Sequence, residues 1–298
     1  MVTEKSRSRV LVITVHYKTT HGVLALLKSL QALREFSMTR TIVADNLSGG
    51  EYLAILRRGM PDIPSVELLE LPANLGYFGA AKFAYDDYLA KGHDLPDWVI
   101  VCNHDVLIED QDFFSKLFSE DPRAAGVIAP RIQVLPGRVD QNPFMTSRPG
   151  WLRWTQLRVV NSFYGAAAVW DWLYRQKQAA KTSWFALRGK AAAISNGGRQ
   201  SIYAPHGAFM IFSRRYFEAG GYLDGNLFLY GEEISVAEVC RSLGLAVIYE
   251  PSLCVVHNEH TSTGKRITRF TYECQKKALR YLTSRYLTGS GSTLSDGK

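Results

Sequence analysis

The sequence predicts an α/β protein built on a doubly wound, mostly parallel sheet with helices on its faces. Over the first 130 residues, short apolar runs alternate with helical patterns, and the same alternation returns after residue 203. The run at residues 98–102 is apolar throughout, as is typical of a strand covered on both faces. Both observations favour strands joined by crossover helices.

Each expected element has its own pattern. Residues 10–15 form the first apolar run, and between residues 23 and 33 leucines and valines recur at three- and four-residue steps, which predicts a helix. Further strands are expected at residues 41–44, 66–69, 98–102, 208–212 and 246–249 and in the run that ends at His257. Further helices are expected at residues 51–58, 78–89, 232–243 and 267–286.

Length and composition are those of a globular protein. The chain has 298 residues with 46% hydrophobic content, enough for one large domain with an added subdomain. The four cysteines lack the close paired spacing of a zinc site, which favours a reduced, cytoplasmic setting. The apolar run at residues 10–15 is too short for a signal sequence or a membrane span.

Between residues 130 and 203 the alternation stops, and part of this stretch is basic and rich in tryptophan. Residues 148–190 contain five of the six tryptophans and eight basic residues against one acid, Asp171. Such a composition suits a surface helix at an anionic membrane interface, or equally a helical subdomain with tryptophans in its core. No nucleic-acid-binding motif occurs, so we expect no nucleic-acid partner. The basic residues are Arg148, Arg153, Arg158, Arg175, Lys177, Lys181, Arg188 and Lys190.

Two predicted strands end in carboxylates. Asp105 follows residues 98–102 and Asp45 follows residues 41–44. Ligands of open α/β sheets gather beyond the carboxyl ends of strands, although a polar residue there is also a common turn former. Asp105 could hold Mg²⁺ or Mn²⁺ against two phosphates, and Asp45 could accept a hydrogen bond from a nucleobase or a ribose.

An acidic pair and two histidines follow later in the chain. Glu232 and Glu233 begin a predicted helix, where one ionised carboxylate could act as a general base, or where both could simply compensate the helix dipole. His257 and His260 lie just past a strand. Their three-residue spacing outside a helix is weak evidence for a metal site, and either could be a hydrogen-bonded structural histidine.

Taken together, these residues resemble the family 2 inverting glycosyltransferases, which have the GT-A fold, and in particular the bacterial rhamnosyltransferase-like members that build O-antigen and capsule. The resemblance covers about residues 9–130 and 203–265. Its motifs, in order, are VITVHYKT, VADNLS, ANLGYFGAA, NHDV, HGAFMIFSRRYFEAGGYLD and FLYGEE. Each is loose alone, but six in the right order make a strong case.

The resemblance implies roles for individual residues. Asp105 would bind the metal, in a degenerate DXD motif that begins at Asn103, and His257 would help to hold the metal or the diphosphate. Glu233, with Glu232 beside it, would take the place of the catalytic base, where the family more often has Asp. Gly207 would line the acceptor side. The donor nucleotide would be bound by Asp45, Asn46, Asn74, Gly76, Lys82 and Asn103, with Lys82 standing where the family often has Asn.

The resemblance also implies a function and a division of the chain. We expect an inverting transferase that uses Mg²⁺ or Mn²⁺ and a UDP- or dTDP-sugar. The acceptor would be a lipid-linked glycan of O-antigen or lipopolysaccharide type, at the inner face of the cell membrane. Residues 1–130 would bind the nucleotide sugar, 131–200 would form the basic aromatic insertion, 201–265 the catalytic half, and 266–298 a C-terminal helix and tail.

Two alternatives belong to other functional classes. A sugar-nucleotide nucleotidyltransferase would need a Gly-rich, basic signature near the N-terminus, and residues 14–22 supply only one Gly and one Lys. A catalytically inactive carbohydrate-binding protein of the same fold would not need Asp45, Asp105 and Glu233 together.

Overall fold

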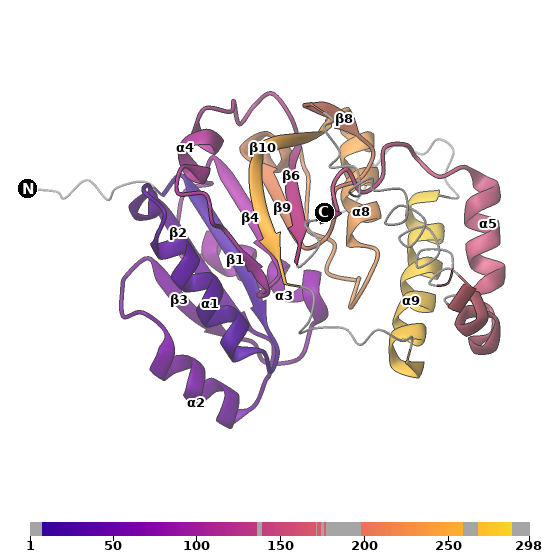
Figure 1. The fold of residues 1–298 in the computed structure, drawn as a ribbon, viewed down its shortest axis with the longest axis horizontal. Helices are drawn as coiled ribbons and strands as arrows, with labels where there is room; N and C mark the ends of the chain where they lie inside the picture. Colours follow the sequence, from indigo (N-terminus) through magenta and orange to yellow (C-terminus); the bar gives the residue numbers. More distant parts are fainter. Residues whose placement is uncertain are drawn as a thin grey trace, which may run out of the picture.

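The computed structural model describes residues 8–135, 139–170, 172–173, 176, 198–258 and 268–287. One sheet runs through the molecule, with helices on both faces (Figure 1). The predicted α/β class with flanking helices is confirmed.

The order of the strands places the ends of β2, β1 and β4 side by side. Across the sheet, the strands are β3 (Val66–Glu70), β2 (Thr39–Asp45), β1 (Val10–His16), β4 (Trp98–Cys102), β9 (Phe209–Ser213), β6 (Val127–Val134), β10 (Val247–His257) and β5 (Val106–Leu107). Two short strands lie off this path: β7 (Val139–Asp140) pairs with β6, and β8 (Gln200–Ile202) with β10. From β3 to β4 all pairs are parallel, whereas β9 runs antiparallel between β4 and β6, so the sheet is mixed.

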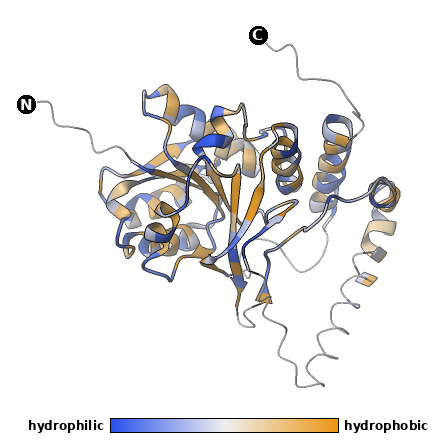
Figure 2. Ribbon diagram, turned by 90° about the horizontal axis from the view of Figure 1, so that it is seen from above, coloured by the Kyte–Doolittle hydropathy of each residue, from blue (hydrophilic) through white to orange (hydrophobic). Residues whose placement is uncertain are grey.

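Helices lie on both faces of this sheet, and two further helices lie beside each other at one end of the molecule (Figure 1). They are α1 (Thr20–Gln31), α2 (Gly50–Gly59), α3 (Gly76–Ala90), α4 (Phe113–Phe118), α5 (Trp151–Val160), α7 (Arg214–Glu218), α8 (Glu232–Ser242) and α9 (Arg269–Leu282). Short 3₁₀ and π segments occur at Phe36–Met38 and Thr283–Leu287. In β1, Leu11 and Ile13 belong to the core under α3, and Val10 and Val12 to the core under α1. Since both faces are buried, the strand is apolar except for Thr14 and His16 near its end, and hydrophobic strands fill the centre of Figure 2.

The structure adds a strand that the sequence pattern did not predict. Strand β6 contains Pro130 and Arg131, which interrupt the apolar run. Pro130 lies opposite Glu250, where the register of β10 against β6 shifts, and a proline without an N–H is tolerated at such an irregularity. The boundary drawn at residue 130 therefore falls inside a strand, and residues 131–134 belong to the sheet. The two runs expected at residues 246–257 form the single strand β10.

The basic, tryptophan-rich segment is helical where it is described. Helix α5 lies beside α9 at the end of the molecule away from α2 (Figure 1). Trp154 is buried, whereas Trp151 and Trp172 are 73% and 55% exposed. One tryptophan of this segment therefore lies in a core, as a helical subdomain requires, and two lie on the surface, as a membrane-facing helix requires. Trp184 and the basic residues Arg175, Lys177, Lys181, Arg188 and Lys190 lie outside the described residues.

The C-terminal helix is confirmed as α9, with Thr268 as its N-cap. Within the described ranges, no helix combines the length and apolar character that crossing a membrane requires.

Candidate active site

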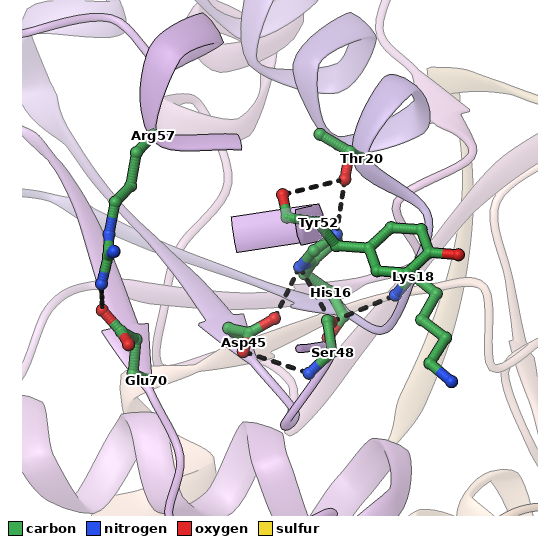
Figure 3. Close-up of polar contacts among 8 residues, drawn as sticks. All are labelled: His16, Lys18, Thr20, Asp45, Ser48, Tyr52, Arg57 and Glu70. Atoms are coloured by element: carbon green, nitrogen blue, oxygen red, sulfur yellow. Dashed lines mark hydrogen bonds and ion pairs between the residues drawn. The ribbon is translucent and has the colours of Figure 1, made fainter. Parts of the chain in front are cut away.

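The carboxyl ends of β1 and β2 meet in a buried polar cluster. His16 ends β1 and Asp45 ends β2, and the parallel register places the two residues opposite each other. His16 Nδ1 lies 2.7 Å from Asp45 Oδ1, and the backbone N–H of Ser48 donates to Asp45 Oδ2 at 3.3 Å (Figure 3). His16 Nε2 lies 3.1 Å from the hydroxyl of Thr20. Asp45 is 1% exposed, so its carboxylate fixes the shape of this edge from within.

Asn46 links this cluster to the loop that begins α3. Its side-chain amide donates to Asn74 Oδ1 at 2.8 Å and to the carbonyl of Gly76 at 3.1 Å, and its Oδ1 accepts from the N–H of Leu75. Gly76 has φ +75°, and a Cβ there would lie 2.0 Å from the carbonyl oxygen of Phe228. A side chain is therefore excluded at Gly76, and Asn46 holds the loop in place.

Lys82 lies outside these contacts. It stands on an exposed position of α3 and forms an ion pair with Asp86, one turn further along the helix. Its aliphatic stem lies against Gly225. The structure thus pairs Lys82 with an acid of its own helix.

Asp105 and His257 are brought together from distant parts of the chain. Strand β10 pairs with β5 so that His257 lies opposite Val106, and the N–H of Asn258 donates to the carbonyl of Asp105. His257 Nε2 lies 3.2 Å from Asp105 Oδ1. Both residues are buried.

A glutamine sets the orientation of the His257 ring. Gln141 Oε1 lies 2.8 Å from His257 Nδ1. Because a carbonyl oxygen only accepts, Nδ1 carries the hydrogen, and a neutral ring then turns the lone pair of Nε2 toward Asp105. Two acceptors facing each other at this distance are stabilised by a positive charge between them.

The Asp105–His257 pair fits a divalent cation. Ligands at about 2.1 Å and at right angles on one ion lie about 3 Å apart, close to the separation of these two atoms. An imidazole whose other nitrogen is hydrogen-bonded is the usual arrangement at metal centres. Among the described residues, no third His, Cys, Asp or Glu joins them, so the remaining ligands would be water and phosphate oxygens, as Mg²⁺ prefers.

A second histidine stands beside this pair. His206 Nδ1 accepts from the N–H of Ala208 at 3.1 Å, so its Nε2 carries the hydrogen. The ring centroid is 6.1 Å from that of His257 and 5.2 Å from that of Phe144. Burial, followed by the charge of His257, lowers the pKa of His206 to about 4 and keeps it neutral.

The acidic pair converges on Gly207. Strand β9 is preceded by this glycine, and a Cβ there would lie 2.6 Å from Glu232 Oε1 and 2.9 Å from Glu233 Oε1. The missing side chain therefore makes room for both carboxylates. Tyr77, at the start of α3, donates its hydroxyl to the carbonyl of Gly207 at 3.0 Å.

Burial and mutual repulsion separate the two carboxylates chemically. Burial, then the charge of Glu233, raises the pKa of Glu232 well above its usual value. Burial also raises the pKa of Glu233, but hydrogen bonds with backbone groups, including those of Gly207 and Gly231, oppose the shift. Glu233 is therefore the carboxylate that ionises more easily.

Tyr77 shows that the acids and Asp105 share one neighbourhood. Its pKa is raised well above its usual value by burial and then by the charges of Cys102, Glu232, Glu233 and Asp105. The structure thus gathers Asp105, His257, Glu232 and Glu233 at one edge, with Asn103 next to Asp105, where its backbone N–H bonds to Ala208.

Comparison with known proteins shows what this arrangement is similar to. No family model matches the chain. The N-acetylglucosaminyl-diphospho-decaprenol L-rhamnosyltransferase of Mycobacterium tuberculosis is 25% identical over 261 residues, which cover 85% of this chain and 77% of that protein.

Two solved structures share the fold. S. aureus TarS in complex with UDP-GlcNAc has a TM-score of 0.57 at 10% identity, over 95% of this chain and 68% of that chain. The mannosyltransferase PcManGT from Pyrobaculum calidifontis, in complex with GDP-Man and Mn²⁺, has a TM-score of 0.51 at 15% identity, over 95% of this chain and 76% of that chain. Both have the GT-A fold.

These findings support a glycosyltransferase with the GT-A fold. The resemblance to rhamnosyltransferase-like enzymes that the motifs predict is confirmed. The sequence relative is named as a rhamnosyltransferase, which favours this class over a nucleotidyltransferase.

Several residues of this site have no signal in the sequence. His16 ends an apolar strand, and only the parallel register with β2 reveals its contact with Asp45. Gln141 lies in the stretch where the βα alternation has stopped, although the neighbouring NPF sequence marks a turn. Tyr77 lies inside the ANLGYFGAA motif and could have been noticed there. His260 lies outside the described residues.

Proposed function

We propose that the chain is an inverting glycosyltransferase that transfers a sugar from a UDP- or dTDP-sugar to a lipid-linked glycan of a bacterial surface polysaccharide. The observation that carries the proposal is the convergence of Glu232 and Glu233 on Gly207, at the edge of the sheet that also holds Asp105 and His257. A base for the acceptor and a site for the leaving diphosphate then lie side by side.

Glu233 acts as the general base in this proposal. Its carboxylate takes the proton of the acceptor hydroxyl, while the acceptor oxygen bonds to the anomeric carbon and the bond from that carbon to the diphosphate breaks. Glu232, whose pKa is raised further, stays protonated and leaves a single negative charge at the base. A single displacement of this kind inverts the anomeric centre.

The donor lies along the ends of β1, β2 and β4. The loop of Asn74 and Gly76, held by Asn46, would contact the nucleotide, and Asp45 would act by fixing the shape of the nucleotide site. Asp105 and His257 would hold Mg²⁺ or Mn²⁺, with Asn103 two residues before Asp105 at the first position of the degenerate DXD motif. A bound divalent cation there neutralises charge on the departing diphosphate. PcManGT was solved with Mn²⁺, which supports this assignment.

The acceptor is inferred from the relative and from the insertion. The relative is named for transfer to N-acetylglucosaminyl-diphospho-decaprenol, a lipid-linked substrate. In the present chain, Trp151 and Trp172 are exposed, and so are Arg153 and Arg158 in the same segment. Apolar and basic side chains together suit an anionic membrane surface, and we place the enzyme at the inner face of the cell membrane.

Donor hydrolysis and transfer test the proposal. The protein is incubated with UDP-, dTDP- and GDP-sugars, with Mn²⁺ and with EDTA, and the released nucleotide diphosphate is measured. Release from a UDP- or dTDP-sugar that requires the metal supports the proposal. Release from none of the donors, with or without a glycolipid acceptor, contradicts it.

A further inference from the structure

A groove between α5 and α9 lies outside the site described above. Its volume is about 370 Å³, within the range of small-ligand sites. It is lined from α5 by Arg158 and Val159, and from α9 by Lys276, Leu279 and Arg280. The groove is therefore formed entirely between the insertion and the C-terminal helix.

The charge of this groove is positive. Arg158, Lys276 and Arg280 line it, and no acidic residue does. In the part of the chain that the structure describes, none of the three forms an ion pair. The one acid of α9, Glu273, is not among the lining residues. Three neighbouring cations attract an anion, and phosphate groups match guanidinium and ammonium donors best.

The two walls of the groove are held in place by packing. The hydroxyl of Tyr272 donates to the carbonyl of Asn161 at 3.0 Å, and the ammonium of Lys276 lies 3.3 Å from the carbonyl of Ser162. The ring of Tyr164 packs edge-on against Tyr272 at 5.3 Å. The cations are therefore presented by a preformed surface.

Exposed apolar side chains lie on the same segment as the groove-lining residues of α5. Val159 lines the groove and is 64% exposed, and Trp151, Leu152 and Phe163 are 73%, 66% and 74% exposed on the same segment. Such side chains are stabilised when they enter the boundary between headgroups and acyl chains. A soluble phosphate would leave them in water.

We propose that this groove binds the phosphate group of an anionic membrane lipid while Trp151, Leu152, Val159 and Phe163 enter the bilayer surface. The proposal rests on the membrane association proposed above and names the site that produces it. It is independent of the transfer chemistry.

Vesicle flotation with two charge-matched variants tests the proposal. The groove variant is Arg158→Gln/Lys276→Gln/Arg280→Gln. The control is Arg153→Gln/Arg269→Gln/Lys277→Gln, which removes the same charge from exposed positions of the same two helices. With phosphatidylglycerol vesicles, we expect the groove variant to bind at least about tenfold more weakly than the wild type, and the control to lose much less.

Each other outcome has a distinct meaning. Equal losses of vesicle binding in both variants, or no loss in either, would overturn the proposal that the groove binds a lipid phosphate. At most a diffuse electrostatic attraction would then remain. Failure of the wild type to float would overturn both the groove and the membrane association. Calorimetry with inorganic phosphate and pyrophosphate forms the second arm: saturation of the groove by either, without any preference for vesicles, would overturn the assignment to a lipid. Thermal unfolding and Mn²⁺-dependent UDP binding, measured on the same variants, show whether fold and donor site are intact.

Discussion

Asp45 and Asp105 lie at the ends of β2 and β4, the two strands that flank β1 in the sheet. Asp45 has both carboxylate oxygens engaged, one by His16 and one by the N–H of Ser48, and it is 1% exposed. Asp105 is also buried, but it faces a histidine whose other nitrogen is occupied by Gln141. Two similar sequence patterns therefore give different chemistry.

The difference lies in what the partners can do. Around Asp45, donors surround the carboxylate and come from the protein itself, so the cluster is complete. Around Asp105, an imidazole nitrogen and a carboxylate oxygen face each other, an arrangement that a cation completes. We therefore expect substitutions at the two sites to affect different measurements, stability at Asp45 and ligand binding at Asp105.

The largest expected effect is on kcat, at Glu233, the proposed general base. Removal of a general base typically costs about 10²–10⁴-fold in rate, so Glu233→Gln should lower kcat by about that factor with little change in donor affinity. Glu232→Gln should lower kcat less. Steady-state kinetics on both variants check this, and a larger loss in Glu232→Gln would make Glu232 the base.

Glu232 and Glu233 also predict how kcat and stability depend on pH. Because the pKa values of both glutamates are raised, the base ionises only at higher pH, and kcat should rise with pH above the range of an ordinary glutamate. Stability should change in the opposite direction. A carboxyl whose pKa is higher in the fold than in the unfolded chain stabilises at low pH, and that contribution is lost as pH rises through the raised value. Urea unfolding across this pH range, with the Glu232→Gln/Glu233→Gln variant as the control, separates the two effects.

Asp105→Ala should remove the effect of Mn²⁺ on donor binding. The variant leaves His257 without the carboxylate that would share the cation, so calorimetry should show UDP binding of equal affinity with and without Mn²⁺. Circular dichroism should show an intact fold. Asp110→Ala, which removes the carboxylate paired with Lys116 in the following connection, is the control. Mn²⁺-enhanced binding in Asp105→Ala would exclude Asp105 as the metal ligand.

Asp45→Ala should affect stability instead. It leaves His16 and the Ser48 N–H without their buried partner, which we expect to lower the free energy of unfolding by about 3 kcal/mol. Glu70→Ala is a matched control, because Glu70 lies opposite Asp45 in the register of β2 and β3 but forms an exposed ion pair with Arg57 (Figure 3). Exposed pairs contribute about 0–1 kcal/mol. Equal losses in the two variants would show that the Asp45 cluster is not structural.

The fold class and the positions of Asp45 and Asp105 at the edge of the sheet are predictable from the sequence, whereas the partners of these two carboxylates are not. Continuous apolar runs that end in Asp45 and Asp105 locate both carboxylates at one edge of the sheet, because parallel strands share that edge. What the runs do not contain is the partner. His16 meets Asp45 through the register of β1 and β2, and His257 meets Asp105 through the pairing of β10 with β5. The register of β10 against β6 also depends on an irregularity at Pro130 that the apolar pattern conceals. Local pattern thus predicts where a carboxylate lies, and tertiary pairing decides what it does.

The smallest expected effect is on metal affinity. It concerns the contact of Gln141 with His257, which distinguishes the surroundings of Asp105 from those of Asp45. Gln141→Leu removes the acceptor at His257 Nδ1, so the ring can turn or place its hydrogen on Nε2, where it would donate to Asp105 instead of binding a metal. Loss of such an indirect partner typically costs about 10–100-fold in metal affinity. Titration of free Mn²⁺ by electron paramagnetic resonance measures this directly, without turnover. Gln141→Glu, which keeps an acceptor at the same place, should restore most of the affinity, and equal affinities in Gln141→Leu and the wild type would show that Gln141 only fills space beside His257.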